Sequence, residues 1–108
     1  MKTIPGFILL ALAGAALAQA PAPAGNAEAA KSKISMCTGC HGIPGYKTVY
    51  PQVYQVPMIT GQQPVYMVNA LQAYRSGARS HPSMRGIAQS LSEQDMADLA
   101  AYYSSQPR

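Results

Sequence analysis

The sequence predicts an all-α domain of short helices that enclose a large apolar group not supplied by the chain itself. Three segments place apolar residues at the spacing of one helix face, and no alternating run is long enough to indicate a sheet. The 108-residue chain has no Trp, and its single Phe, Phe7, lies near the N-terminus. The core must therefore be built from Leu, Ile, Val, Met and Tyr, which is little bulk for a small domain.

The N-terminal segment has the pattern of a secretory signal peptide. Lys2 precedes an apolar stretch over residues 7–17 that ends in small residues and is too short to span a bilayer. We expect cleavage after Ala18, so that residues 1–18 are the signal peptide and the mature chain starts at Gln19. An uncleaved anchor is the alternative, because Lys2 and the α-amino group are the only charges on the flank.

The mature chain has room for one domain. Residues 19–26 alternate Pro and Ala without periodic apolar positions, which predicts an extended, disordered leader. Residues 27–108 are expected to form the folded domain. Its first helix is predicted from a cap at Asn26 to about residue 34, and it leads directly into Cys37.

Two further helices are predicted, separated by two long loops over residues 42–62 and 78–91. One helix begins at Pro64 and ends at Gly77, and its inner face is Met67, Ala70, Leu71 and Tyr74. The other follows a Ser92 cap with Asp95 in the capping-box position, and Pro107 ends it. Its inner face is predicted to be Met96, Leu99, Ala100 and Tyr103, with Glu93, Gln94 and Asp98 toward water.

The segment "SMCTGCHGIP" holds the only two cysteines of the chain, Cys37 and Cys40, next to His41. A zinc site would need four ligands, and beyond His41 the only other histidine is His81. A thioredoxin-like pair expects a βαβ setting, and a plain disulfide leaves His41 without a role. Cysteine, two residues, cysteine and histidine is the attachment signature of haem c, in which both thiols bond the vinyl groups and the histidine binds the iron.

The second axial ligand of such an iron would come from His81 or from a methionine. Met67 and Met96 lie on predicted inner faces, and Met36 adjoins Cys37 too closely to reach the opposite side. Met84 lies in the loop "SHPSMRGIAQS", which could fold over a ring, and is favoured. Its rival, Met58, also lies in a loop, whereas His81 is expected to be a solvated turn residue before Pro82.

The stretches "CTGCHG", "VPMITGQQPVYMVNALQAYRSGARS" and "MRGIAQSLSEQDMADLAAYYSSQ" resemble a small bacterial class I c-type cytochrome, similar to one lobe of the two-haem periplasmic cytochromes. The resemblance covers nearly all of residues 27–106. It implies the class I cytochrome c fold, in which the first and last helices cross beside one covalently bound haem. It also implies Met84, seven residues before Leu91, as the distal ligand. A proline carbonyl, that of Pro57 or alternatively Pro51, would accept the free N–H of His41.

The function implied is that of a periplasmic one-electron carrier with a His/Met-ligated haem c, and not of an enzyme. The carboxylates are few and are expected to be solvated or to complement helix dipoles: Glu28, Glu93, Asp95 and Asp98. One alternative is the haem subunit of a dehydrogenase complex. Another is a five-coordinate haem sensor or peroxidase, which requires that Met84 is not a ligand.

The basic residues outnumber the acidic ones, so they either steer the protein to partners with acidic surfaces or only keep a small protein soluble. Expected partners are redox proteins such as a membrane oxidase, reductase or dehydrogenase, which a monomer would meet briefly. Nucleic acid is excluded because the basic residues form no dense cluster with interleaved aromatics. Stable membrane insertion after signal cleavage is not expected. The residues predicted to steer docking are Lys31, Lys33, Lys47, Arg75, Arg79 and Arg85.

Overall fold

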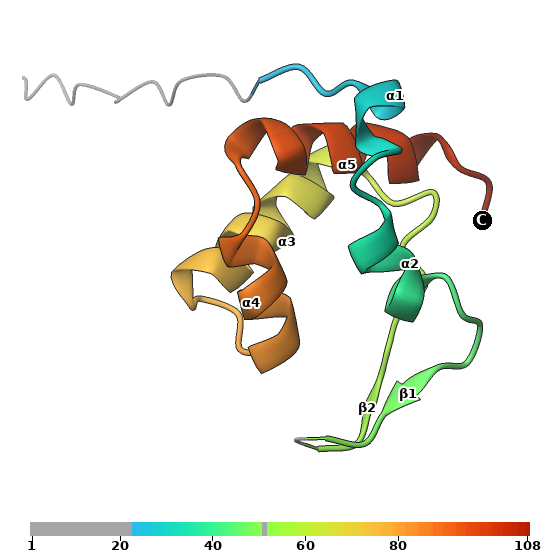
Figure 1. Cartoon of the computed structure of the whole chain (residues 1–108), viewed down its shortest axis with the longest axis vertical. Helices are drawn as coiled ribbons and strands as arrows, with labels where there is room; N and C mark the ends of the chain where they lie inside the picture. Colours follow the sequence, from blue (N-terminus) through green and yellow to red (C-terminus); the bar gives the residue numbers. More distant parts are fainter. Residues whose placement is uncertain (1–22, 51) are drawn as a thin grey trace, which may run out of the picture.

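The computed structural model describes residues 23–50 and 52–108, so the predicted signal peptide lies outside the described residues. These residues form a small helical body from which one hairpin extends (Figure 1). The predicted all-α class is confirmed, with one short two-stranded ladder added. The elements in chain order are α1 (Ala27–Ala30), α2 (Ser35–His41), β1 (Lys47–Thr48), β2 (Tyr54–Gln55), α3 (Pro64–Ser76), α4 (Pro82–Gln89) and α5 (Glu93–Ser105).

Helix α5 is the centre of the fold and begins where the sequence predicts. The Ser92 side chain accepts the Asp95 backbone N–H, and the Asp95 carboxylate accepts the Ser92 N–H, which completes the capping box. Helix α5 packs against both α1 and α3, and α1 crosses it in Figure 1. Its predicted inner face is buried, namely Met96, Leu99, Ala100 and Tyr103.

Helix α3 also matches its prediction. Pro64 occupies its first turn, where the missing N–H needs no partner. Gly77 ends it in the left-handed region with φ of +88°, a conformation that a side chain would strain. The helix packs on α4 and α5, and Met67 from its inner face joins the buried core.

The N-terminal helix is shorter than predicted. Helix α1 ends at Ala30, and residues 31–34 form a turn before α2 begins at Ser35. Ala30 is fully buried against α5, and the turn brings the Lys33 ammonium to two carboxylates of that helix. Where α1 ends, the chain therefore makes contacts with α5 that the sequence does not indicate.

Part of the predicted disordered leader is ordered. Residues 19–22 lie outside the described residues, but the Asn26 N–H donates to Asp98 Oδ1 at 2.8 Å and the Gln94 side chain donates to the Ala24 carbonyl at 2.8 Å. Gly25 approaches the Ala97 backbone so closely that no Cβ would fit. The folded unit among the described residues thus includes Ala24 to Asn26, because hydrogen bonds to α5 satisfy their backbone groups.

Both long loops contain secondary structure. In the first, β1 and β2 pair antiparallel, Lys47 with Gln55 and Thr48 with Tyr54, and the hairpin points away from the helices (Figure 1). In the second, predicted to be irregular, Pro82 opens α4 and the His81 ring accepts the Met84 N–H at 3.4 Å as the N-cap. Met84 therefore lies on a helix and not in a flexible loop, which corrects the sequence prediction. Within the described residues, no helix is long and apolar enough to cross a membrane.

Candidate functional site

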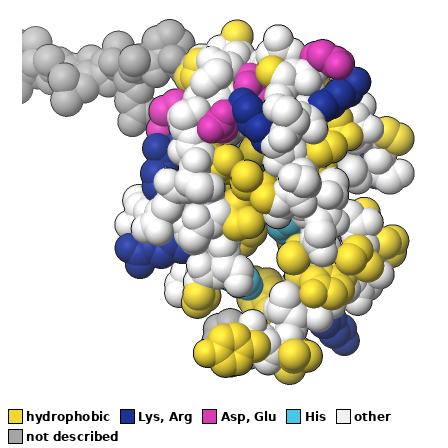
Figure 2. Space-filling view, in the orientation of Figure 1, with side chains coloured by type: hydrophobic (Ala, Val, Ile, Leu, Met, Phe, Trp, Pro, Cys, Tyr) yellow, Lys and Arg dark blue, Asp and Glu magenta, His cyan; other side chains and the backbone are white. Residues whose placement is uncertain are grey.

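The candidate site is a cavity between α2, α3, α4, α5 and the chain after β2. Its lining is mostly apolar, and Figure 2 shows hydrophobic side chains together with histidine where this face of the molecule is hollowed. Helices α3 and α5 supply one wall with residues from their predicted inner faces: Met67, Ala70, Leu71, Tyr74, Leu99 and Tyr103. The predicted site residues also line this cavity, namely Cys37, Cys40, His41, Pro57 and Met84.

Helix α2 places both cysteines at the cavity. Cys37 and Cys40 are separated by about one turn, so their side chains leave the helix on the same side. Both are free thiols, half-buried, and both line the cavity. A disulfide is therefore absent, and the described residues contain no group of three or more His, Cys, Asp or Glu side chains that could hold a metal by themselves.

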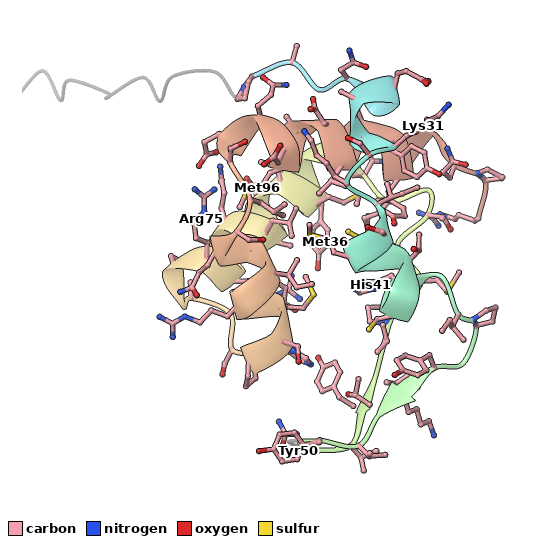
Figure 3. All side chains as sticks on the ribbon, in the orientation of Figure 1. Lys31, Met36, His41, Tyr50, Arg75 and Met96 are labelled. Carbon is pink, nitrogen blue, oxygen red and sulfur yellow. The ribbon has the colours of Figure 1, made fainter. Side chains whose placement is uncertain are left out.

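His41 ends the same helix with its ring at the cavity (Figure 3). Its Nδ1 lies 2.6 Å from the carbonyl oxygen of Pro57. Because a carbonyl can only accept, Nδ1 carries a proton, and in the neutral ring the lone pair is on Nε2, where another partner can bind it. Pro51, the alternative partner, lies outside the described residues.

Methionines line the cavity from different elements. Met84 comes from α4, which is one wall. Met58 directly follows Pro57, the residue that contacts His41, and half of it is exposed. Met67 and Met96 are buried in the core, as predicted. Met36 is on α2 itself and lies at the cavity edge.

His81 is not the solvated turn residue that the sequence predicted. Its ring caps α4 and packs edge-on against Tyr54 with 4.8 Å between ring centroids. It also lines the cavity. Its ring nitrogen Nδ1 is occupied by the Met84 N–H, so the residue has a structural role in holding α4.

Tyr103 provides a test of whether a cofactor fits this cavity. The residue is 5% exposed and lines the cavity, yet its hydroxyl has no hydrogen-bond partner among the described residues. Buried hydroxyls in proteins are nearly always satisfied, so this one indicates a polar contact that the free chain does not supply. Two free thiols, an available imidazole nitrogen and apolar walls fit a covalently attached haem.

Burial controls the protonation of the groups beside this cavity. It raises the pKa of the Cys37 thiol, and the proximity of the Tyr103 hydroxyl partly offsets that effect. Burial also raises the pKa of Tyr103, and the nearby Cys37 adds to this. Both groups are therefore protonated near neutral pH, so the thiol at position 37 is not activated by its surroundings.

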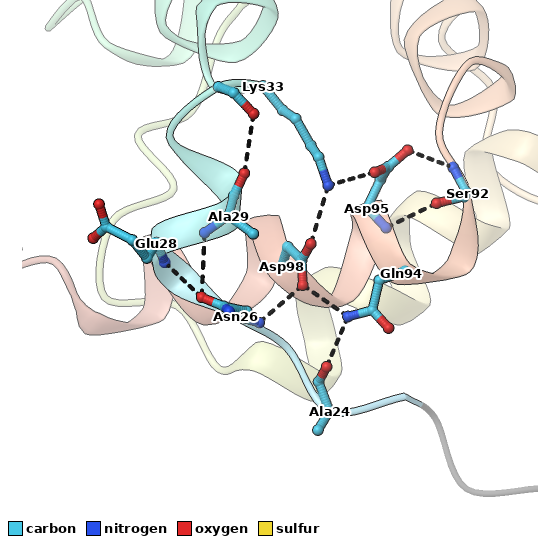
Figure 4. Close-up of polar contacts among 10 residues, drawn as sticks. Ala24, Asn26, Glu28, Ala29, Lys33, Ser92, Gln94, Asp95 and Asp98 are labelled. Carbon is cyan, nitrogen blue, oxygen red and sulfur yellow. Dashed lines mark hydrogen bonds and ion pairs between the residues drawn. The ribbon is translucent and has the colours of Figure 1, made fainter.

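Outside the cavity, a polar cluster joins the N-terminal segment to α5 (Figure 4). Lys33 Nζ contacts Asp95 at 2.5 Å and Asp98 at 3.0 Å. Asp98 is 2% exposed, which corrects the prediction that it faces water. The hydrogen bond from Lys33 is the largest cause that lowers the pKa of Asp95, to about 2. No sequence pattern indicates this cluster, because Lys33 and Asp98 are 65 residues apart in the sequence.

The basic residues divide into paired and unpaired groups. Lys31 pairs with Glu28, Lys33 with the carboxylates of α5 and Arg75 with Glu93. Arg79 lines the cavity and lies over the Tyr74 ring, 4.8 Å from its centroid. Among the described residues, Lys47 and Arg85 form no ion pair. Only part of the predicted positive surface is therefore free of a neighbouring carboxylate.

Comparison with known proteins gives concordant matches. The family "Cytochrome c" matches residues 13–106. Cytochrome c-554(548) of Halomonas halodenitrificans is 42% identical over 88 residues, which is 77% of this chain and 99% of that protein. Cytochrome c4 of Pseudomonas aeruginosa is 35% identical over 92% of this chain, and here the chain spans only 46% of the relative. The crystal structure of reduced recombinant cytochrome c4 from Pseudomonas stutzeri matches with a TM-score of 0.62 at 35% identity, over 78% of this chain and 47% of that one.

Proposed function

Because this chain belongs to the cytochrome c family and carries a covalently bound haem c, we propose that it is a periplasmic one-electron carrier with His41 and Met84 as axial ligands. The observation that carries the proposal is that Cys37, Cys40 and His41 from α2 line the same cavity as Met84 from α4. Two separate elements thus offer iron ligands to one apolar space.

Each residue of α2 has a separate task. Cys37 and Cys40 would hold the haem covalently, each through a thioether bond to one vinyl carbon, with the thiol hydrogen on the other vinyl carbon. His41 offers Nε2 to the iron while Pro57 holds Nδ1–H, which fixes the ring orientation. When bound, the haem supplies an iron that gains and loses one electron.

Met84 is favoured over Met58 by position. Met58 follows the proline that contacts His41, so it belongs to the proximal side of the cavity. Met84 lies on α4, which the His81 cap and packing against α3 hold in place. A thioether on a rigid helix can remain on the iron in both oxidation states, so electron transfer needs little rearrangement.

The same proposal covers location and processing. Residues 1–18 would direct export, and the haem would be attached in the periplasm to a chain that starts at Gln19. The mostly apolar cavity suits a carrier, because electron transfer requires no substrate pocket and no proton donor. As the haem subunit of a dehydrogenase complex, the chain would use the same residues for the same step.

Optical spectroscopy of the purified holoprotein with and without carbon monoxide tests the ligation. The native protein should be six-coordinate and low-spin in both oxidation states and should not bind carbon monoxide. Met84→Ala should lose the sulfur-to-ferric-iron charge-transfer band and bind carbon monoxide. Its reduction potential should fall by on the order of 0.1 V, since axial ligands shift haem potentials over a range of about 0.8 V.

Met58→Ala is the matched control, because Met58 lines the same cavity and is half-exposed. It should keep the charge-transfer band, the potential and the resistance to carbon monoxide. If Met58→Ala showed the losses and Met84→Ala did not, the assignment of the distal ligand would be wrong. Carbon monoxide binding by the native protein would favour a five-coordinate haem sensor or peroxidase.

A further inference from the structure

The Tyr103 hydroxyl is the buried polar group of the cavity that the proposed ligation leaves without a role. Its ring is packed into the core with Ala30, Leu99 and Ala100, and Tyr102 lies edge-on to it at 5.1 Å between centroids. Its hydroxyl meets no hydrogen-bond partner among the described residues. Ring packing explains an aromatic residue at this position, but it does not explain an oxygen.

Cys37 is the neighbouring residue that offers a hydrogen-bond acceptor to the Tyr103 hydroxyl. Both residues line the cavity, and Cys37 packs against the core cluster that contains Tyr103. Burial raises the pKa of Tyr103, so its hydroxyl keeps its proton and is available as a donor. In the free chain the Cys37 sulfur carries its own hydrogen, whereas a thioether sulfur can only accept.

The chemistry of haem limits the acceptor further. The vinyl groups and the propionates lie on opposite edges of the ring, and Cys37 bonds to the vinyl edge. A hydroxyl beside Cys37 is therefore remote from both propionate carboxylates. We propose that Tyr103 donates a hydrogen bond to the thioether sulfur of Cys37, and so positions the attached edge of the haem against α5. This inference rests on the proposed attachment at Cys37.

Such a bond has two consequences. It satisfies the buried hydroxyl and ties the cofactor edge to the α1–α5 crossing that holds Tyr103. It also directs the positive end of the O–H dipole toward the haem. Because the reduced haem carries one positive charge fewer, removal of the donor should disfavour reduction and lower the potential.

Tyr103→Phe tests the inference, because it keeps the ring and removes only the oxygen. In resonance Raman spectra of the holoprotein, the C–S stretching band of the Cys37 thioether should shift, and the reduction potential should fall. The methionine–iron charge-transfer band should stay. Tyr102→Phe, on the adjacent ring, is the control and should change neither property.

A second experiment separates the sulfur from other acceptors. In a Cys37→Ala background, which retains attachment through Cys40, Tyr103→Phe should no longer change the potential. A change of equal size there would show that the hydroxyl meets another group and would overturn the proposal, as would unchanged Raman and potential values in Tyr103→Phe alone. Mass measurement of the denatured native protein reports covalent attachment separately, so a failure of the proposed attachment would be recognised on its own.

Discussion

Asp98 is a buried carboxylate that three donors hold from two parts of the chain. The Asn26 N–H and the Gln94 amide donate to Oδ1 at 2.8 Å each, and Lys33 donates to Oδ2 at 3.0 Å. The backbone hydrogen bond from Asn26 is the largest cause that lowers its pKa. The carboxylate is thus stabilised in its charged form in the folded protein, and it links the N-terminal segment to α5.

The first prediction at this scale concerns acid stability. Because the folded pKa of Asp98 lies below its ordinary value of 3.8, its charge contributes stability that is fully present well above pH 3.8 and is lost as the pH falls through the lower folded pKa. Asp98→Asn should lower the free energy of unfolding by about 1–3 kcal/mol at pH 7. The difference from the native protein should shrink as the pH falls below 3.8. Urea denaturation of both holoproteins between pH 7 and pH 2 measures this difference in the free energy of unfolding.

Glu28→Gln is the matched control, since Glu28 is an exposed carboxylate in an ion pair with Lys31. Exposed pairs contribute about 0–1 kcal/mol, so this variant should follow the native protein. His41 is common to all three proteins, and acid effects at the iron therefore cancel in the comparison. A gap between Asp98→Asn and the native protein that stayed constant down to pH 2 would contradict the assignment.

At the scale of elements, the segment before α1 behaves as part of the helical body. Residues 24–26 lie against α5, and the Asn26 side chain caps α1 by accepting the N–H groups of Glu28 and Ala29. The same residue therefore begins one helix with its side chain and joins another with its backbone. This dual use explains why the chain is ordered before the first helix.

Gly25→Ala should disrupt this docking. A Cβ there would collide with the Ala97 carbonyl, and backbone cannot yield as a flexible side chain can. Overpacking of this kind costs about 1–3 kcal/mol. We expect a lower denaturation midpoint and faster hydrogen exchange at the Asn26 amide, which would lose its bond to Asp98.

Gly86→Ala provides the comparison for this substitution. Gly86 lies in α4, and no atom of the described residues beyond its own helical turn stands within 4 Å of the place that a Cβ would occupy. This variant should be neutral or more stable by up to about 1 kcal/mol, because Ala favours helix. Equal stability of Gly25→Ala and the native protein would mean that the segment does not need this close approach.

Helix α4 shows why loop composition misled the prediction. Its sequence "PSMRGIAQ" combines Pro, Ser and Gly, which are typical of loops, and gives only a short helix. Packing against α3 stabilises it, with a Pro at its start and a His81 cap. Tertiary contacts of this kind supply most of the stability of short helices.

For the whole molecule, we expect the cofactor to be a structural component as well as a redox centre. Few large side chains are fully buried in the described chain, and Met96 is one of them. The cavity walls instead come from half-buried residues of α3 and α4 that face the cavity. The haem would complete the core that these side chains begin.

Removal of both thiols should therefore prevent stable folding. Cys37→Ala with Cys40→Ala should abolish covalent haem and leave a chain with low helix content and no cooperative thermal transition. Circular dichroism and haem staining measure the two effects. Thr38→Ala, an exposed substitution within the same turn, should retain both haem and fold. A compact, helical, haem-free monomer from the double variant would show that the core is sufficient without the cofactor.

The distribution of charge predicts how salt affects encounters with anionic partners. Lys47 and Arg85 have no ion pair among the described residues, and Arg79 lies at the cavity. Oxidation of the reduced protein by ferricyanide, a small anionic probe, should slow as ionic strength rises.

Charge-reversal variants distinguish two roles of the basic residues, which are electrostatic steering of a partner and solubility of the protein. Lys47→Glu or Arg85→Glu should weaken the salt dependence. Arg108→Glu, at the chain end where the guanidinium contacts the Gly61 carbonyl, should change it less. The same order is expected with a membrane oxidase or reductase that has an acidic docking surface. Rates that are indifferent to salt would leave solubility as the only role of these charges.

Features that depend on near neighbours along the chain could be predicted from the order of the amino acids alone. The bounds of α3 and α5 follow from Pro64, Gly77 and the Ser92–Asp95 capping box, and all of these act within one turn. The spacing of Cys37, Cys40 and His41 likewise predicted that they form one site. All three belong to a single short helix, and they line the same cavity. These are local effects of backbone geometry, which a sequence pattern can express.

Features that join distant residues depended on the folded arrangement of the helices. The pairing of His41 with Pro57 spans 16 positions, and that of Asn26 with Asp98 spans 72. Asp98 has the helical spacing of a solvated residue, and it is buried because a segment from the other end of the chain lies over it. A hydrogen bond of this kind depends on how α1 crosses α5. The sequence on either side of Asp98 does not indicate that crossing.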